Sequence, residues 1–311
     1  MPWLRNMLAL VSLGLGFIAG AQVTNTTMTT ADAFLCTGSA NYQSGADLTG
    51  LNFGDAGTLA IAPANSAKGE FRSVIRFSLT NLVNQFDTNF GVGRWVVTGL
   101  ALELTSNYGT GGVQPNNPIF NVVSEGRFVI EWMADDTWVE GTGNPSQPAT
   151  DGITYGLLPT YLVQPHVPLG TNTYTPPGNN VHVTWPLPLE TNLVADVQAG
   201  GAVSFYFYAA DAQVAYLFNS YKYGRGNEPR LQVVAVALPE TLELVSGVFT
   251  NQMFRLIGQG TANAVYSVQA NTNLATTNWL TIGSTTAGTN GAIQFDDTGV
   301  IHVQRFYRLS Q

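Results

Sequence analysis

The sequence predicts an all-β protein, a jelly roll or two-sheet β-sandwich followed by a small β-sandwich domain. Segments that alternate between apolar and polar residues recur along the whole chain, and clusters of Gly, Pro and Asn separate them. Charged residues make up only 10% of the 311 residues. That share is far below the usual quarter, and it suits a turn-rich β-protein better than a helical enzyme.

The clearest strand signals lie in the first two thirds of the chain. Residues 73–79 and 128–132 alternate in hydrophobicity, as expected for strands with one buried face. Residues 203–208 carry aromatic side chains on both faces, which predicts a central strand covered on two sides. One helix is expected within 189–201, where apolar residues recur at helical spacing before Gly200-Gly201.

The changes in composition along the chain predict its division into parts. Pro239-Glu240 reads as a hinge, and after it short strands recur about a dozen residues apart, with Asn290-Gly291 as a hairpin signal. The predicted parts are a signal peptide (1–21), a flexible leader (22–30), a jelly-roll domain (31–238), a linker (239–247) and a small β-sandwich (248–311).

The N-terminus predicts export from the cell. Arg5 precedes an apolar core over 7–18, and Ala19-Gly20-Ala21 fits a cleavage site. We therefore expect a secreted, extracellular or cell-surface protein with no membrane insertion after cleavage, since the apolar run is too short to span a bilayer comfortably. Cys36 is the only cysteine, so the exported fold has no internal disulfide, and we expect this thiol to be buried.

The charge balance excludes two classes of partner. The formal net charge is −8 with 12 Lys and Arg, and loss of Arg5 with the signal peptide makes it about −9. Such a chain cannot form a broad phosphate-binding surface, so nucleic acid is not an expected partner. The same argument disfavours anionic membranes.

Residues 135–143 (DDTWVEGTG) contain three carboxylates close in sequence to Trp138. A glycosidase requires two carboxyl groups about 5–9.5 Å apart. Along a strand, Asp136 and Glu140 would lie about 13 Å apart, and the local Gly and β-branched residues oppose a helix. Catalysis here would need a tight loop or a carboxylate from elsewhere in the chain.

Two other interpretations of this stretch stay open. Asp135, Asp136 and Asp151 are hard oxygen ligands that would suit calcium, which is the only cofactor that the sequence suggests. Alternatively, Trp138 belongs to the core and the acids cap turns.

The histidines give no metal site. His166, His182 and His302 show no metal-ligand spacing, and a single cysteine argues against zinc. The sequence contains no G-x-S-x-G turn, so it does not predict a serine nucleophile. A histidine acting as a lyase base with help from Tyr or Arg remains an alternative.

Aromatic residues in predicted loops are the stronger lead. Sugar rings pack their C–H faces on aromatic rings, so glycan-binding modules expose Trp or Tyr. The candidate ligand-binding residues are Tyr155, Tyr161, Tyr174, Tyr221, Tyr223 and Arg225. Arg225 and the neighbouring Lys222 would suit an acidic sugar, although solvated loop charges are the commoner outcome.

Residues 32–237 resemble the secreted DNRLRE-type modules, a jelly-roll family grouped with carbohydrate-binding modules. The resemblance rests on an ordered set of pieces: Asp32-Ala33-Phe34, Asn41-Tyr42, Leu59-Ala60-Ile61, Arg72 with the strand 74–79, the WVEGTG element at 138–143, and EPRLQV at 228–233. The naming hexapeptide is absent, and the loop 159–181 is long, so no ligand residue carries over. The resemblance implies a jelly roll with a carbohydrate-related role.

Residues 248–309 resemble a C-terminal β-domain common in secreted bacterial proteins, through YSVQA at 266–270, Asn278-Trp279, FDD at 295–297 and RFYRL at 305–309. No activity is attached to that domain. Together these features predict a non-catalytic module that binds polysaccharide or a cell-surface glycan. The alternatives are a polysaccharide hydrolase or lyase, and a structural or adhesive surface protein.

Overall fold

The structure is a computed structural model. It describes residues 22–39, 46–107, 120, 125–175, 177–178, 180–212, 214–223, 226–238, 242–250, 253–261, 263–299 and 304–310. The chain forms two compact units, and the larger one ends at Leu238. The predicted signal peptide, Arg225 and His302 lie outside the described residues.

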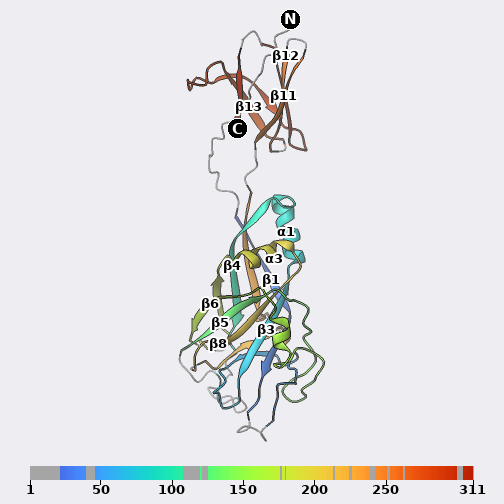
Figure 1. The fold of residues 1–311 in the computed structure, drawn as a ribbon, viewed down its shortest axis with the longest axis vertical. Helices are drawn as coiled ribbons and strands as arrows, with labels where there is room; N and C mark the ends of the chain where they lie inside the picture. The colour runs from blue at the N-terminus through green and yellow to red at the C-terminus, as the bar shows by residue number, and fades with distance from the viewer. Residues whose placement is uncertain are drawn as a thin grey trace. The chain divides into compact units, whose positions relative to one another are not determined.

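The larger unit, residues 22–238, is built on an eight-stranded antiparallel sheet (Figure 1). In spatial order its strands are β6 (His166–Tyr174), β5 (Gly126–Met133), β8 (Ala202–Ala209), β3 (Phe71–Ser78), β1 (Gln22–Cys36), β10 (Arg230–Ala237), β4 (Trp95–Thr105) and β7 (His182–Leu187). A separate pair joins β2 (Thr58–Ile61) to β9 (Tyr216–Asn219). The all-β class is therefore confirmed.

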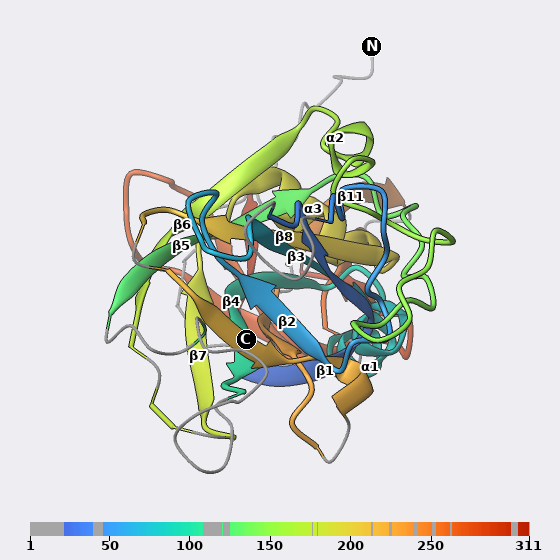
Figure 2. The same ribbon diagram turned by 90° about the horizontal axis from the view of Figure 1, so that it is seen from below.

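This sheet curls until its two outermost strands meet. β6 and β7 contact one another, and the rings of Tyr174 and Trp185 lie 5.6 Å apart across the gap. Seen from below, the strands surround a common interior (Figure 2). The inner face supplies the main core, because alternate residues of each strand point inward.

The predicted alternation assigns the two faces of the sheet. Ile75 and Phe77 of β3, Phe205 and Phe207 of β8, and Phe128, Ile130 and Trp132 of β5 all belong to the main core. The intervening residues therefore lie on the outer face. That face is only partly apolar, and it carries most of the charged groups discussed below.

The segment after β5 covers part of the outer face. Trp138, Ile153 and Leu158 pack against Ala33 of β1 and Val74 of β3 in a second core cluster. This segment includes the short helix α2 (Leu158–Tyr161), which lies outside the curled sheet (Figure 2). Trp138 and Cys36 are both buried, as predicted.

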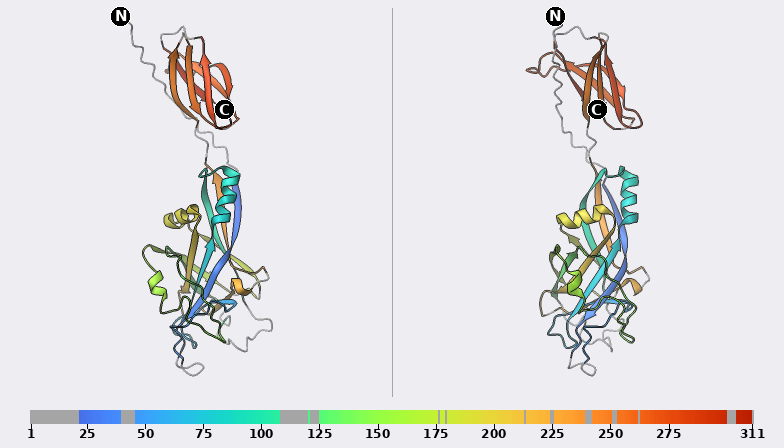
Figure 3. Two further views of the ribbon diagram at one scale, coloured as in Figure 1. Left: turned by 90° about the vertical axis from the view of Figure 1, so that its right-hand side faces the viewer. Right: turned by 45° about the vertical axis from the view of Figure 1, so that its right-hand side comes forward.

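Two longer helices pack into the main core (Figure 3). The predicted one is α3 (Thr191–Ala199), which begins where the side chain of Glu190 accepts the N–H of Leu193 and ends at Gly200 with φ of 78°. The other, α1 (Thr80–Phe90), was not predicted, because its Asn and Thr residues have low helix propensity. In the described part of the chain, every helix is too short or too polar to cross a membrane.

The prediction of a flexible leader over 22–30 is wrong. These residues form the first part of β1, which pairs with β10 from Gln22↔Val236 to Met28↔Arg230. Thr and Val suit a strand in this segment, and β10 offers a complete edge for it to pair with. The larger unit therefore includes residues 22–30.

The smaller unit consists of two three-stranded sheets. One contains β11 (Glu243–Thr250), β12 (Met253–Gln259) and β15 (Ala292–Asp297), and the other contains β14 (Leu280–Thr286), β13 (Val265–Asn271) and β16 (Phe306–Ser310). Since β11 begins at Glu243, the predicted linker over 239–247 is too long. The hairpin predicted at Asn290-Gly291 is also wrong, because this turn joins β14 of one sheet to β15 of the other.

Candidate functional site

Seven polar side chains from five regions of the larger unit form a connected group on and beside the outer face of the sheet, which we call the outer-face cluster. Its members are Glu70, Arg72, Glu131, Tyr155, His166, Tyr206 and Tyr208. The strand order β6-β5-β8-β3 brings them together, although they extend from residue 70 to residue 208 of the sequence. Glu131 pairs directly with Tyr206, and Tyr206 pairs directly with Val74.

Arg72 is the centre of one half of the cluster. Its Nε donates to Oε1 of Glu70 at 2.6 Å, and its Nη1 donates to the hydroxyl of Tyr206. The guanidinium also lies over the ring of Tyr155, 5.2 Å from the centroid. The Tyr155 hydroxyl donates to Oε2 of Glu70 at 2.6 Å. Both oxygens of Glu70 are therefore engaged inside the cluster, and so are two nitrogens of the Arg72 guanidinium.

Glu131 and His166 form the other half. The Glu131 side chain is only 5% exposed and makes a hydrogen bond with Nδ1 of His166 on the neighbouring strand β6. Burial, followed by the charge and hydrogen bond of Glu131, raises the pKa of Tyr208 to about 12. The rings of Tyr206 and Tyr208 lie 4.9 Å apart, so the tyrosines link the two halves.

The tyrosine hydroxyls of the cluster remain protonated donors near neutral pH. Burial and the hydrogen bond to Glu70 raise the pKa of Tyr155 to about 12. Burial likewise raises the pKa of Tyr206. Tyr155 and Tyr208 are half-buried, and the Arg72 and His166 side chains are 27% and 29% exposed, so the cluster reaches the surface.

The arrangement offers base chemistry and recognition. A histidine whose Nδ1 is held by a buried carboxylate has its other ring nitrogen free of that bond, which is the arrangement of an oriented general base. The cluster contains no serine or cysteine, so it has no residue of the usual nucleophilic type for acyl transfer. Its tyrosines offer ring faces and hydroxyl donors to a sugar.

Two of the predicted tyrosines pack against the second core cluster. Tyr155 belongs to the outer-face cluster as well, and Tyr161 is half-buried. Tyr221 and Tyr223 lie in a 3₁₀ turn, η1 (Tyr221–Tyr223), that contacts β1 and β2.

The prediction that Tyr174 reaches a ligand is wrong. It is the last residue of β6 and is 3% exposed, because its ring packs into the main core against Trp185 and Tyr216. The segment 159–181, which was expected to be a loop, instead contains the strand β6.

A second charged group lies where η1 meets β1. Asp32 accepts the N–H of Tyr221 at 2.7 Å, and its own backbone N–H donates to Oε1 of Glu140 at 3.0 Å. Lys222 Nζ lies 3.4 Å from the other oxygen of Glu140. Burial raises the pKa of Asp32 to about 7, and the charge of Glu140 adds to that shift.

The three aspartates considered for calcium do not form a common site. Oδ1 of Asp135 accepts from the N–H of Thr137 at 2.8 Å, and Oδ1 of Asp151 accepts from the N–H of Thr142 at 3.0 Å. Each of these acids therefore caps a turn. In the described part of the chain, no three His, Cys, Asp or Glu side chains form a group able to hold a metal ion.

Asp136 is in a different situation. Burial raises its pKa to about 6, and the charge of Asp196 on α3 adds to that effect. Its Oδ1 is buried and makes no hydrogen bond. This carboxyl group is therefore easier to protonate than that of an exposed aspartate.

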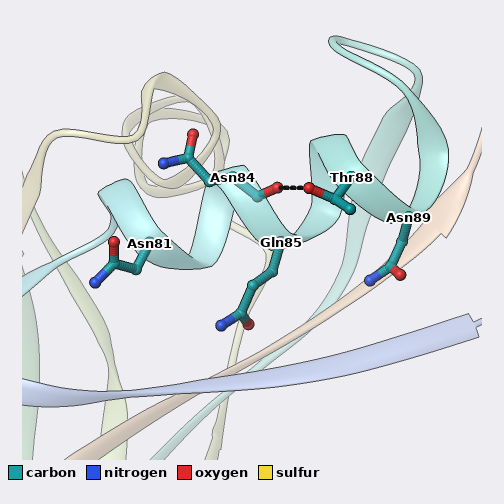
Figure 4. A pocket seen from close by; sticks show the side chains of 5 residues that line it. All are labelled: Asn81, Asn84, Gln85, Thr88 and Asn89. Carbon is teal, nitrogen blue, oxygen red and sulfur yellow. Dashed lines mark hydrogen bonds between the residues drawn. The ribbon is translucent and has the colours of Figure 1, made fainter.

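An open hollow lies on the exposed side of α1 (Figure 4). Its lining consists of Asn81, Asn84, Gln85, Thr88 and Asn89, and Thr88 Oγ1 donates to the backbone oxygen of Asn84 at 2.7 Å. α1 contacts β1, β4 and β10, whereas the cluster lies on the other half of the sheet. With no charged or titratable side chain, this surface offers no catalytic group.

Sequence reasoning missed Glu70, Arg72, Tyr206 and Tyr208 as site residues, and it considered Glu131 only as a possible partner of the carboxylates in 135–143. The signal for the tyrosines was present, because 203–208 was expected to have aromatic residues on both faces. Only the strand order shows that the outward-facing ones lie between Arg72 and Glu131.

No family model and no curated protein matches the chain. Among solved structures, a β-glucuronidase from Ruminococcus gnavus is similar with a TM-score of 0.20 and 8% identity, covering 88% of this chain and 38% of that one. A β-glucuronidase from an uncultured Clostridium species gives 0.23 and 8%, covering 98% and 44%. The chain thus spans about two fifths of those proteins. Similarity at this level supports no assignment of fold or function.

Proposed function

We propose that this protein is a secreted or cell-surface module that binds a polysaccharide through the outer-face cluster. The observation that carries the proposal is the pair of half-buried tyrosines, Tyr155 and Tyr208, at a surface rich in hydrogen-bonding groups. Each hydroxyl is bonded to a buried or half-buried carboxylate. The rings are therefore held in place before a ligand arrives, which lowers the entropic cost of binding.

The composition of the cluster supports a sugar more than other ligands. Aromatic faces pack against the C–H groups of a pyranose ring, and fixed carboxylates and hydroxyls pair with its hydroxyl groups. A surface of this kind offers little to a phosphate backbone, since its single guanidinium is already bonded to Glu70 and Tyr206.

Substitution of the tyrosines tests the proposal. The purified chain should bind at least one polysaccharide on a glycan array, and Tyr155→Ala or Tyr208→Ala should weaken that binding by about tenfold, the order expected for loss of one stacking aromatic. Phe249→Ala is the matched control, because Phe249 is an exposed aromatic (61%) in the smaller unit. Equal binding by the tyrosine variants and the control would place the ligand elsewhere.

The same array tests calcium. If calcium fixes a loop near the ligand, EDTA should lower retention and added calcium should restore it. The turn-capping alternative for Asp135 and Asp151 predicts that EDTA changes nothing.

One observation favours a second candidate function, a polysaccharide hydrolase or lyase. His166 is oriented by the buried Glu131, and three tyrosines and an arginine lie in the same cluster. An enzyme should release new reducing ends or unsaturated sugars from a bound glycan, and His166→Gln should abolish that release while binding persists. A bound polymer that stays intact over prolonged incubation would exclude this candidate.

A further inference from the structure

The charges of the outer-face cluster distinguish between classes of glycan. Four of its side chains carry or can carry a formal charge: the carboxylates Glu70 and Glu131, the guanidinium Arg72 and the imidazole His166. With a neutral imidazole, two carboxylates stand against one guanidinium, and the cluster has a formal charge of −1. With a protonated imidazole the charge is zero. In neither state does the cluster have an excess positive charge.

The positive groups are also engaged already. Arg72 donates to Glu70 and Tyr206 and lies over the ring of Tyr155. His166 is paired with Glu131. An acidic sugar would compete with Glu70 for Arg72, which would weaken the ion pair of a half-buried carboxylate and place that carboxylate next to the incoming one.

Two other cations of the larger unit do not change this result. Arg76, also on β3, donates to the backbone oxygens of Asp136 and Trp138 at 2.7 and 2.6 Å and lies over the Trp138 ring. Lys222 is paired with Glu140, close to Asp32. The whole chain has a formal charge of −8, so long-range electrostatic repulsion also disfavours the binding of polyanions.

We infer that the outer-face cluster binds an uncharged glycan, and that Glu70 and Glu131 exclude acidic polysaccharides from it. This inference rests on the proposed function, because it names the substrate class of the same site. Carboxylates here have two roles: they hold the tyrosines and accept hydrogen bonds from sugar hydroxyls, and they repel a carboxylated ligand. Elimination chemistry on uronic acids, one form of the enzyme alternative, is disfavoured by the same charges.

The first experiment is a glycan array that contains neutral and uronic-acid glycans, probed with the purified full chain at low ionic strength. Binding confined to neutral glycans, or stronger there by about tenfold, is expected from like-charge repulsion. Equal or stronger binding to the uronic-acid glycans would overturn the inference and leave the proposed function standing. Binding to no glycan would overturn both.

The second experiment compares pairs of polymers that share a backbone and differ in charge. The probes are methyl-esterified homogalacturonan against the same polymer after de-esterification, and hydroxyethylcellulose against carboxymethylcellulose. Glu70→Gln and Glu131→Gln should each reduce the preference for the neutral member by about fivefold or more, because each removes one repelling charge. Added salt should also reduce the preference of the unchanged protein.

Glu243→Gln is the control, since this exposed carboxylate of β11 lies in the smaller unit. Its preference should match that of the unchanged protein. If either cluster variant fails to fold, the other variant and the salt series give the same test. A preference that neither salt nor the carboxylate variants alter would overturn the proposed role of Glu70 and Glu131.

Discussion

The carboxyl group of Asp32 is almost completely buried, with 1% of the residue exposed, and it accepts the N–H of Tyr221. Burial raises its pKa to about 7, well above the value near 3.9 of an exposed aspartate. Between these values the unfolded chain loses the proton while the folded protein keeps it. Folding is therefore favoured at the acidic end of this range, and the stability declines as the pH rises towards 7.

Asp32→Asn should remove most of this dependence. A shift of about three pKa units corresponds to a loss on the order of 4 kcal/mol between pH 4 and pH 8. Asparagine can still accept the Tyr221 N–H, so the variant should gain stability relative to the unchanged protein as the pH rises. Urea unfolding at the two pH values measures the difference. Parallel pH profiles for the two proteins would contradict a buried, protonated Asp32.

At the residue scale, the sequence was informative where a side chain's environment depends on its own strand. Trp138 is buried, which agrees with one of the interpretations that the sequence left open for residues 135–143. Tyr174 was misplaced because the sequence did not show that β6 extends as far as this residue. The outer-face cluster depends on strand order, and no local pattern specifies which of eight strands are neighbours.

The element at residues 138–143 is held by a buried clamp, Asn52. Its Nδ2 donates to the backbone oxygens of Glu140 and Ile153 at 2.6 and 2.8 Å, and its Oδ1 accepts from the N–H groups of Gly54 and Gly143 at 3.0 and 3.1 Å. A β-carbon at Gly141, which has φ of 80°, would lie 2.3 Å from Asn52 Oδ1. The glycines of this element therefore permit close approach of the clamp, which is a structural role.

Asn52→Ala should consequently be costly. Four buried backbone groups would lose their partner, and the expected loss in the free energy of unfolding is about 3–5 kcal/mol. Asn52→Asp keeps the acceptor but loses the donor, so its loss should be smaller than that of Asn52→Ala only at low pH, where the carboxyl group is protonated. Chemical denaturation of both variants at two pH values provides the measurement. A loss below about 1 kcal/mol for the alanine variant would show that this element is held by Trp138 alone.

Elements with strong periodicity were predicted and those stabilised by tertiary contacts were not. β3, β5, β8 and α3 followed from alternation or helical spacing. α1 has an unfavourable composition and is held by Leu82 and Phe86 in the core. The first half of β1 looked like a polar leader because its strand character depends on β10, more than two hundred residues away.

At the scale of the whole molecule, the two units have separate cores. The main core and the two clusters beside it draw only on residues 23–235, whereas the remaining clusters draw on residues 242–309. The boundary at Leu238 follows the last strand of the larger unit, so a cut there breaks no described strand. Each unit therefore has the means to fold alone.

We expect a fragment of residues 22–238 to fold and to retain glycan binding within about twofold of the full chain, since the whole outer-face cluster lies within it. A fragment that begins at residue 31 should be much less stable, because it lacks the β1 residues that pair with β10. Thermal unfolding of the two fragments, with glycan binding of the longer one, tests both points. Equal stability of the two fragments would show that residues 22–30 contribute nothing to the fold, as a flexible leader would. Loss of binding by the longer fragment would show that the smaller unit contributes to the binding site.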